Sequence, residues 1–123
     1  MIISKRHKKS ALKTKVVNRI TEIPPDDWNR VYPNTLESYG FYKTLDEAGI
    51  DQFTLFYIMV YDRKTPIAAT PCFLVNYSLD TSISGPLRRM TNSIKKVMPN
   101  IFSLKAVVCG TPMSQGRIGI VGN

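Results

Sequence analysis

The glycine-rich segment near the end of the sequence is the feature whose residue types and spacing most clearly suggest chemistry. Gly110, Gly116 and Gly119 follow an apolar run over Leu104–Cys109 that has the composition of a strand. A loop of this kind after a strand can present backbone N–H groups to an anion, and pyrophosphate sites are built this way when a helix follows the loop. Because no helix is expected between Gly119 and Asn123, an ordinary turn is the alternative interpretation.

The tyrosines are a second group of residues that could take part in binding. Tyr39 and Tyr42 fall on one predicted helix, and Tyr57 and Tyr61 fall on one predicted strand. Such rings stack on nucleobases where they accompany basic segments. Aromatic residues at strand spacing are also typical packing residues, so a role in the core is the alternative.

Other catalytic chemistry has few candidate residues. The chain has one histidine, His7, and two cysteines, Cys72 and Cys109. These are too few for a disulfide framework or a metal site, and we expect no bound metal. Both cysteines lie in apolar surroundings, which predicts buried free thiols.

Basic residues are concentrated at the N-terminus of a chain whose net charge is +8. Residues 1–15 are predicted to form a flexible basic arm, and residues 16–123 the folded part. The arm either contacts nucleic acid or anionic lipid or is a solvated terminus. Its candidate nucleic-acid contacts are Lys5, Arg6, Lys8 and Lys9.

Export and membrane insertion are not indicated by the sequence. The longest apolar run, Leu55–Tyr61, has the length of a strand and is far shorter than the ~18 residues that a membrane helix needs. The basic N-terminus leads into polar sequence without the apolar core of a secretory signal. We therefore expect a cytoplasmic protein with no membrane span.

Proline and glycine positions divide the first half of the chain into a strand and two helices. A strand is predicted over Val16–Ile23 and a short helix from Pro24 to Tyr32. A longer amphipathic helix is predicted from the cap at Asn34-Thr35 to the closing Gly49. Its spacing places Glu37 and Asp46 on the solvent side.

The second half is predicted to contain a β-hairpin, a helix and a buried strand. The hairpin pairs Phe53–Tyr61 with Ile67–Tyr77 through a four-residue connection, and Pro66 and Pro71 predict a bulge or an edge there. A helix from Pro86 to Met98 carries an apolar stripe that we expect in the core; contact with a membrane or an acidic partner is the alternative.

The resulting element order is β-α-α-β-β-α-β. We expect an α/β (α+β) fold with a mostly antiparallel sheet and flanking helices. The last four residues contain no capping or closing element, so the fold is expected to be incomplete.

Several motifs in this order resemble a known family. Ile23–Asn29 resembles the I-P-x-x-W-N opening of bacterial GNAT-family acyltransferases of the BioF2-like and FemAB-related (peptidoglycan-bridge) group. Leu45–Gly49 is similar to the L-E-x-x-G end of the following helix, and Ile67–Phe73 to the A-A-x-P-x-F return strand. Pro86–Arg89 and Cys109–Pro112 continue the pattern. The resemblance covers residues 17–119.

The resemblance implies a GNAT-like fold and transfer of an acyl group from a CoA thioester, or of an aminoacyl group, to an amine. The family's C-terminal half supplies the donor site, so we expect this segment to be inactive alone, to bind no acyl-CoA by itself, and to self-associate through an exposed apolar face. The expected substrate-binding residues are Tyr39, Tyr42, Gly110, Ser114 and Gly116.

One part of the family pattern is not met. Gln115–Gly119 resembles the Q/R-x-x-G-x-G/A acyl-CoA loop, but Ile118 occupies the required glycine position. The alternative function is a non-enzymatic basic module that contacts nucleic acid or an acidic partner. It predicts binding that weakens steeply with salt.

Overall fold

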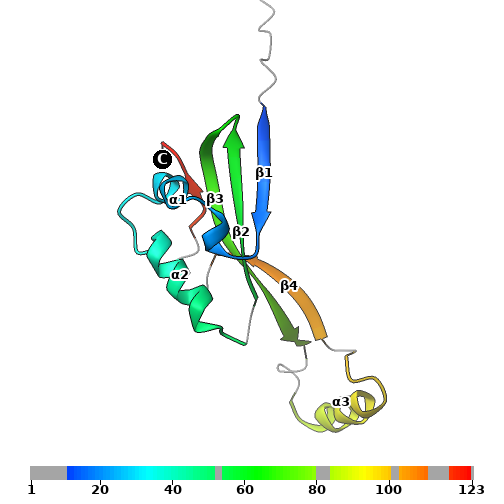
Figure 1. Cartoon of the computed structure of the whole chain (residues 1–123). Coiled ribbons are helices and arrows are strands. Elements are labelled where there is room, and N and C mark those ends of the chain that lie inside the picture. Colours follow the sequence, from blue (N-terminus) through cyan, green and yellow to red (C-terminus); the bar gives the residue numbers. More distant parts are fainter. Residues whose placement is uncertain (1–10, 52–53, 80–83, 101–102, 111–116, 123) are drawn as a thin grey trace, which may run out of the picture.

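Five antiparallel strands form one sheet in the computed structural model, which describes residues 11–51, 54–79, 84–100, 103–110 and 117–122 (Figure 1). The elements in chain order are β1 (Leu12–Val17), the 3₁₀ helix η1 (Ile20–Glu22), α1 (Pro25–Val31), α2 (Tyr39–Ala48), β2 (Thr54–Asp62), β3 (Thr65–Ser78), α3 (Pro86–Val97), β4 (Ser103–Cys109) and β5 (Gly119–Ile120). The predicted mixed fold with an antiparallel sheet and flanking helices is confirmed.

The first strand begins earlier than predicted. All six residues of β1 pair with β2, from Leu12 opposite Asp62 to Val17 opposite Tyr57. The prediction of a flexible arm through residue 15 is therefore wrong over 12–15. Exposed lysines do not prevent strand formation here, because β1 is an edge strand and edge strands accommodate lysine.

The start of α1 and the end of α2 have the expected boundary signals, although α2 starts late. Pro25 begins α1, as its preference for the first turn predicts. Ser38 caps α2 by accepting a hydrogen bond from the Phe41 N–H at 3.3 Å, and Gly49 ends it at φ 59°. The predicted cap at Asn34-Thr35 is wrong, because Asn34 adopts φ 54° in a turn before the helix.

The sheet has the strand order β1-β2-β3-β4, and β5 pairs with β3 beyond the end of β4. Two residues, Arg63 and Lys64, connect β2 to β3 instead of the predicted four. The register shifts where Val60 pairs with Ala68 and Tyr61 pairs with Pro66, which confirms the predicted bulge. The carbonyl of Pro71 accepts a hydrogen bond from the Gly110 N–H at the end of β4.

The hydrophobic core lies between one face of the sheet and the helices α1 and α2 (Figure 1). Trp28 is fully buried and stacks on Tyr32 with ring centroids 4.9 Å apart. Tyr42 and Tyr57 contact the Trp28 ring edge-on at 5.2 and 5.6 Å. Asp46 joins three elements, because it accepts hydrogen bonds from the Ile20 N–H at 2.8 Å and the Tyr57 hydroxyl at 2.7 Å. Its predicted place on the solvent side is therefore wrong.

The arm formed by the far ends of β3 and β4, with α3 beyond them, departs most from the sequence-based expectation. The apolar stripe of α3 was predicted to pack in the core, yet all of its large side chains are exposed. The predicted buried strand forms as β4, but it is exposed at every position except the half-buried Ala106. In Figure 1 this arm extends away from α1 and α2, so no described helix covers it.

Candidate functional site

A cavity of about 540 Å³ lies where the end of α1 and the turn after it meet β5. One wall comes from the segment before β5 and from β5 itself, which hydrogen bonds to β3 at Ala68 and Ala69. The lining residues are Val31, Tyr32, Pro33, Thr35, Arg117, Ile118, Gly119 and Ile120. Apolar walls with a few polar groups are typical of small-molecule sites.

Tyr32 holds the two walls of this cavity together. Its hydroxyl accepts a hydrogen bond from the Gly119 N–H at 3.0 Å and lies 3.0 Å from the Ala69 carbonyl and 2.9 Å from the Arg117 carbonyl. Having one proton, the hydroxyl donates to one of these carbonyls at a time. Burial raises the pKa of Tyr32, and the nearby charge of Glu37 adds to the effect. Tyr32 is therefore a neutral positioning group at physiological pH.

Two buried polar atoms in the turn between α1 and α2 have no hydrogen-bond partner among the described residues. They are Oγ1 of Thr35, which lines the cavity, and Oε1 of Glu37. Glu37 is only 6% exposed, and its backbone carbonyl accepts a hydrogen bond from the indole N–H of Trp28 at 3.0 Å. A buried carboxylate is costly unless it meets a donor or a positive charge. Among the described residues nothing donates to Glu37 Oε1, and Glu37 itself does not line the cavity.

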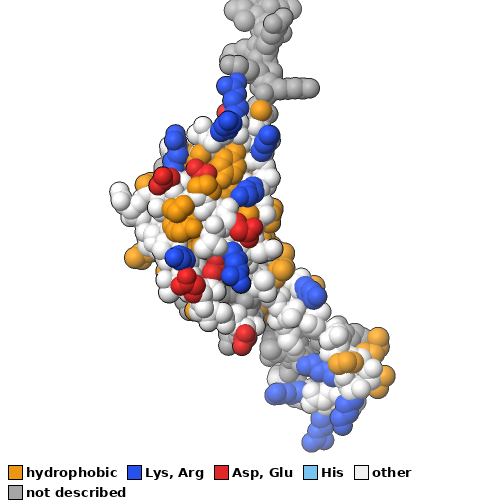
Figure 2. Space-filling model, in the orientation of Figure 1, with side chains coloured by type: hydrophobic (Ala, Val, Ile, Leu, Met, Phe, Trp, Pro, Cys, Tyr) orange, Lys and Arg blue, Asp and Glu red, His pale blue; other side chains and the backbone are white. Residues whose placement is uncertain are grey.

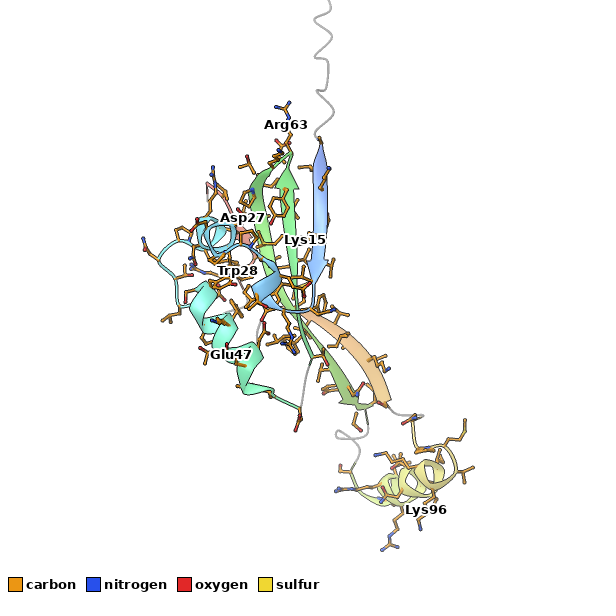
Figure 3. All side chains as sticks on the ribbon, in the orientation of Figure 1. Lys15, Asp27, Trp28, Glu47, Arg63 and Lys96 are labelled. Carbon is orange, nitrogen blue, oxygen red and sulfur yellow. The ribbon has the colours of Figure 1, made fainter. Side chains whose placement is uncertain are left out.

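Sequence reasoning missed Glu37, because helical spacing placed it on a solvent-facing side. The residue lies before α2, in the turn that packs against Trp28. No local signal distinguishes it from an exposed glutamate; only the packing of the turn buries it. The indole of Trp28, which lies between α1 and the sheet in Figure 3, fixes this turn.

The predicted substrate-binding tyrosines do not line this cavity. Tyr39 is half-buried at the start of α2, and Tyr42 is fully buried in the aromatic cluster with Trp28 and Tyr57. The described geometry gives Tyr42 a packing position, which agrees with the alternative interpretation of the tyrosines.

The glycine-rich loop is described only at its two ends. The Gly110 N–H donates to the Pro71 carbonyl at 2.7 Å, and the Gly119 N–H donates to Tyr32. Neither N–H is therefore available to an anion. Ser114 and Gly116 lie outside the described residues, as do the predicted nucleic-acid contacts Lys5, Arg6, Lys8 and Lys9.

Comparison with known proteins gives no identity: no family model, curated protein or solved structure matches this chain. Within the described ranges, no helix is long and apolar enough to cross a membrane. The same residues contain no group of three or more His, Cys, Asp or Glu side chains placed to hold a metal ion. The cavity lined by Tyr32 and Thr35 is the candidate site.

Proposed function

We propose that this chain is the N-terminal, acceptor-binding part of a GNAT-like N-acyltransferase that moves an acyl group from a CoA thioester, or an aminoacyl group, to an amine. The observation that carries the proposal is the buried Glu37 carboxylate, whose Oε1 has no partner among the described residues and which lies in the same turn as the cavity-lining Thr35. A carboxylate and a hydroxyl in the turn that borders an apolar-walled cavity match the charge and the donors of a protonated amine.

The arrangement of the sheet supports this proposal. The two helices between β1 and β2 cover one face of the sheet and bury Tyr57 and Met59. Side chains alternate along a strand, so Phe56, Ile58 and Val60 point to the other face, where they are only half-buried. A strand that is apolar at successive positions is typical of a sheet covered on both sides. The proposed donor half would cover this second face.

In the proposed reaction, Glu37 binds and orients the protonated amine, which then loses one proton to solvent. The neutral nitrogen attacks the thioester carbonyl, a C–N bond forms and the C–S bond breaks. The nitrogen releases its second proton to solvent, and the leaving thiolate takes up a proton. Positioning alone lowers such a barrier substantially, because a bimolecular step becomes intramolecular. The described residues are assigned only to the acceptor, and no described residue is assigned to the donor.

The first experiment is to express the whole reading frame that contains this chain and to measure thiol release from acetyl-CoA with a panel of primary amines. Glu37→Gln should raise KM for the amine by about tenfold or more, because a hydrogen bond to a charged group contributes about 1.5–3 kcal/mol. The matched control is Glu47→Gln, since Glu47 is exposed on α2 and pairs only with Lys43 at 4.0 Å. Its kinetics should be unchanged.

Two results would count against this function. Equal effects of the Glu37 and Glu47 substitutions would remove the acceptor assignment. Absence of acyl transfer by the whole reading frame, together with salt-sensitive binding of nucleic acid, would favour the alternative of a non-enzymatic basic module.

A further inference from the structure

The helix α3 presents a complete apolar stripe to solvent. Leu87, Met90 and Ile94 are 60%, 63% and 37% exposed, and Val97 and Met98 are 82% and 55% exposed. Thr91 is the only residue of α3 that is buried. Large apolar side chains exposed together on one helix face mark an interaction surface, whereas scattered ones do not.

The stripe is bordered by positive charge. At 100° per residue, the five apolar side chains fall within an arc of roughly 100°, and the basic side chains lie outside it. These basic residues are Arg88, Arg89, Lys95 and Lys96. Figure 2 shows this separation at the α3 end of the molecule, with orange side chains on one side and blue side chains on the other.

The charge around α3 has a single sign. From Ser84 to Cys109 the sequence has five basic side chains and no acidic one. The charged side chains on the surface that approaches a partner through α3 are therefore all positive. This surface fits a partner whose surface is negative above an apolar layer.

The position of α3 makes such an approach possible without unfolding. The helix lies beyond the ends of β3 and β4, away from the core formed by α1, α2 and the sheet (Figure 1). Lys96 lies on the outer side of the helix in Figure 3. A flat surface can therefore contact the whole helix, about 18 Å long, without meeting the core.

We propose that α3 binds the surface of an anionic lipid bilayer. The apolar stripe lies at the boundary between headgroups and acyl chains, and the four basic side chains of α3 contact anionic headgroups. A short amphipathic helix with a strongly basic polar face and low overall hydrophobicity is the type of segment that lies in the membrane interface. The proposal goes beyond acyl transfer and does not depend on it.

A bilayer explains the observations better than nucleic acid or an acidic protein. Nucleic acid binds basic side chains but leaves an adjoining aliphatic stripe uncovered. An acidic protein groove would cover the stripe, but it would pair with defined basic positions. The basic residues of α3 instead lie on both sides of Asn92 around the helix, as expected for side chains that reach a continuous layer of headgroups.

The test is sedimentation of the full chain with phosphatidylcholine vesicles, with and without phosphatidylglycerol. Two variants add the same negative charge to α3: Val97→Asp on the apolar stripe and Asn92→Asp at the centre of the basic face. Asn92→Asp should weaken binding to the anionic vesicles about fivefold, the effect of one charge near the surface. Val97→Asp should weaken it at least tenfold further, because it also removes apolar contact.

Controls separate this surface from the rest of the chain. Residues 1–10 are unchanged in both variants. If the chain attached to vesicles through its basic N-terminus, the two variants would therefore bind equally well. Far-UV circular dichroism checks that each variant is folded. Equal losses in the two variants, equal binding to neutral and anionic vesicles, or no binding at low salt would each overturn the proposal. Loss of nucleic-acid binding with vesicle binding unchanged would assign α3 to nucleic acid instead.

Discussion

At the scale of single residues, the two cysteines lie opposite each other on β3 and β4 but differ in exposure. The Cys72 and Cys109 sulfurs are 3.8 Å apart. Cys72 is buried, as predicted, whereas Cys109 is exposed, which corrects the prediction of two buried thiols. Burial, followed by the hydrogen bond to the neighbouring thiol, raises the pKa of Cys72 to about 11. Cys72 therefore carries almost no thiolate near neutral pH.

We predict that iodoacetamide at pH 8 modifies Cys109 and leaves Cys72 unmodified. Cys109 is accessible, while Cys72 is both buried and protonated. Mass spectrometry of peptides from the native protein should find the adduct on Cys109 alone, and Cys109→Ser should abolish native labelling. Labelling in guanidinium should modify both cysteines. Equal labelling of the two thiols in the native state would show that β3 is not covered at Cys72.

Residue types predicted some roles here and not others. The apolar surroundings of Cys72 predicted its burial, and the structure confirms it. Glu37 was not predictable, because its burial depends on a turn held by a hydrogen bond from the Trp28 side chain. The carboxylate becomes buried only after that turn has folded.

At the scale of elements, the attachment of β5 to the rest of the fold depends on one close approach. A Cβ atom added at Gly119 would lie 2.5 Å from Val31 Cγ1 and 2.8 Å from the Tyr32 ring. Both neighbours are buried parts of the core that cannot easily move. Glycine is required at position 119 because a Cβ atom has no space there. Its backbone conformation does not require glycine, since its φ is not positive.

We predict that Gly119→Ala destabilises the protein by about 1–3 kcal/mol, the range for overpacking a filled core. The loss should be local to β5, so amide exchange at residues 119–121 should accelerate more than exchange in β2. The control is Gly40→Ala: a Cβ atom at Gly40 meets nothing within 4 Å. In α2 this change should stabilise by roughly 0.5–1 kcal/mol. Equal effects of the two substitutions would contradict the packing of β5 against Tyr32.

Helix ends marked by proline or glycine were easier to predict than the surroundings of an element. Pro25, Gly49 and Pro86 mark helix ends through local backbone chemistry, and the structure confirms all three. The exposure of α3 and β4 could not be predicted in the same way, because an apolar stripe looks the same whether it faces a core or solvent. Only the position of the arm beyond α1 and α2 decides it.

At the scale of the whole molecule, several acidic groups are held in their neutral forms by folding. Burial is the main cause for each one; for Tyr57 and Tyr61, hydrogen bonds to carboxylates add to it. The pKa is raised to about 12 for Tyr61 and to about 11 for Cys72, and it is also raised for Tyr32 and Tyr57. The folded state therefore retains protons that the unfolded chain releases as pH rises.

We predict that the free energy of unfolding is constant from pH 7 to about 8.5 and falls above that value, where unfolded cysteine and then tyrosine, near pH 10, begin to ionise. Each group whose pKa is raised by folding lowers the free energy of unfolding by up to about 1.4 kcal/mol per pH unit, until the pH reaches its pKa in the folded state. Urea titrations monitored by circular dichroism measure this slope, and tyrosinate absorbance should appear together with unfolding.

Substituting one of these groups tests whether its raised pKa causes the fall in the free energy of unfolding. Tyr61→Phe keeps the ring but removes the hydroxyl that donates to Asp27 at 3.1 Å, so the slope above pH 10 should become shallower. The aromatic core should persist, because Tyr61 is at its margin and Trp28 at its centre. An unchanged slope in this variant, or stability that rises with pH, would show that these tyrosines do not link protonation to folding. A shallower slope would show that the sheet and α1 are held together partly by the neutral phenol bonded to a carboxylate.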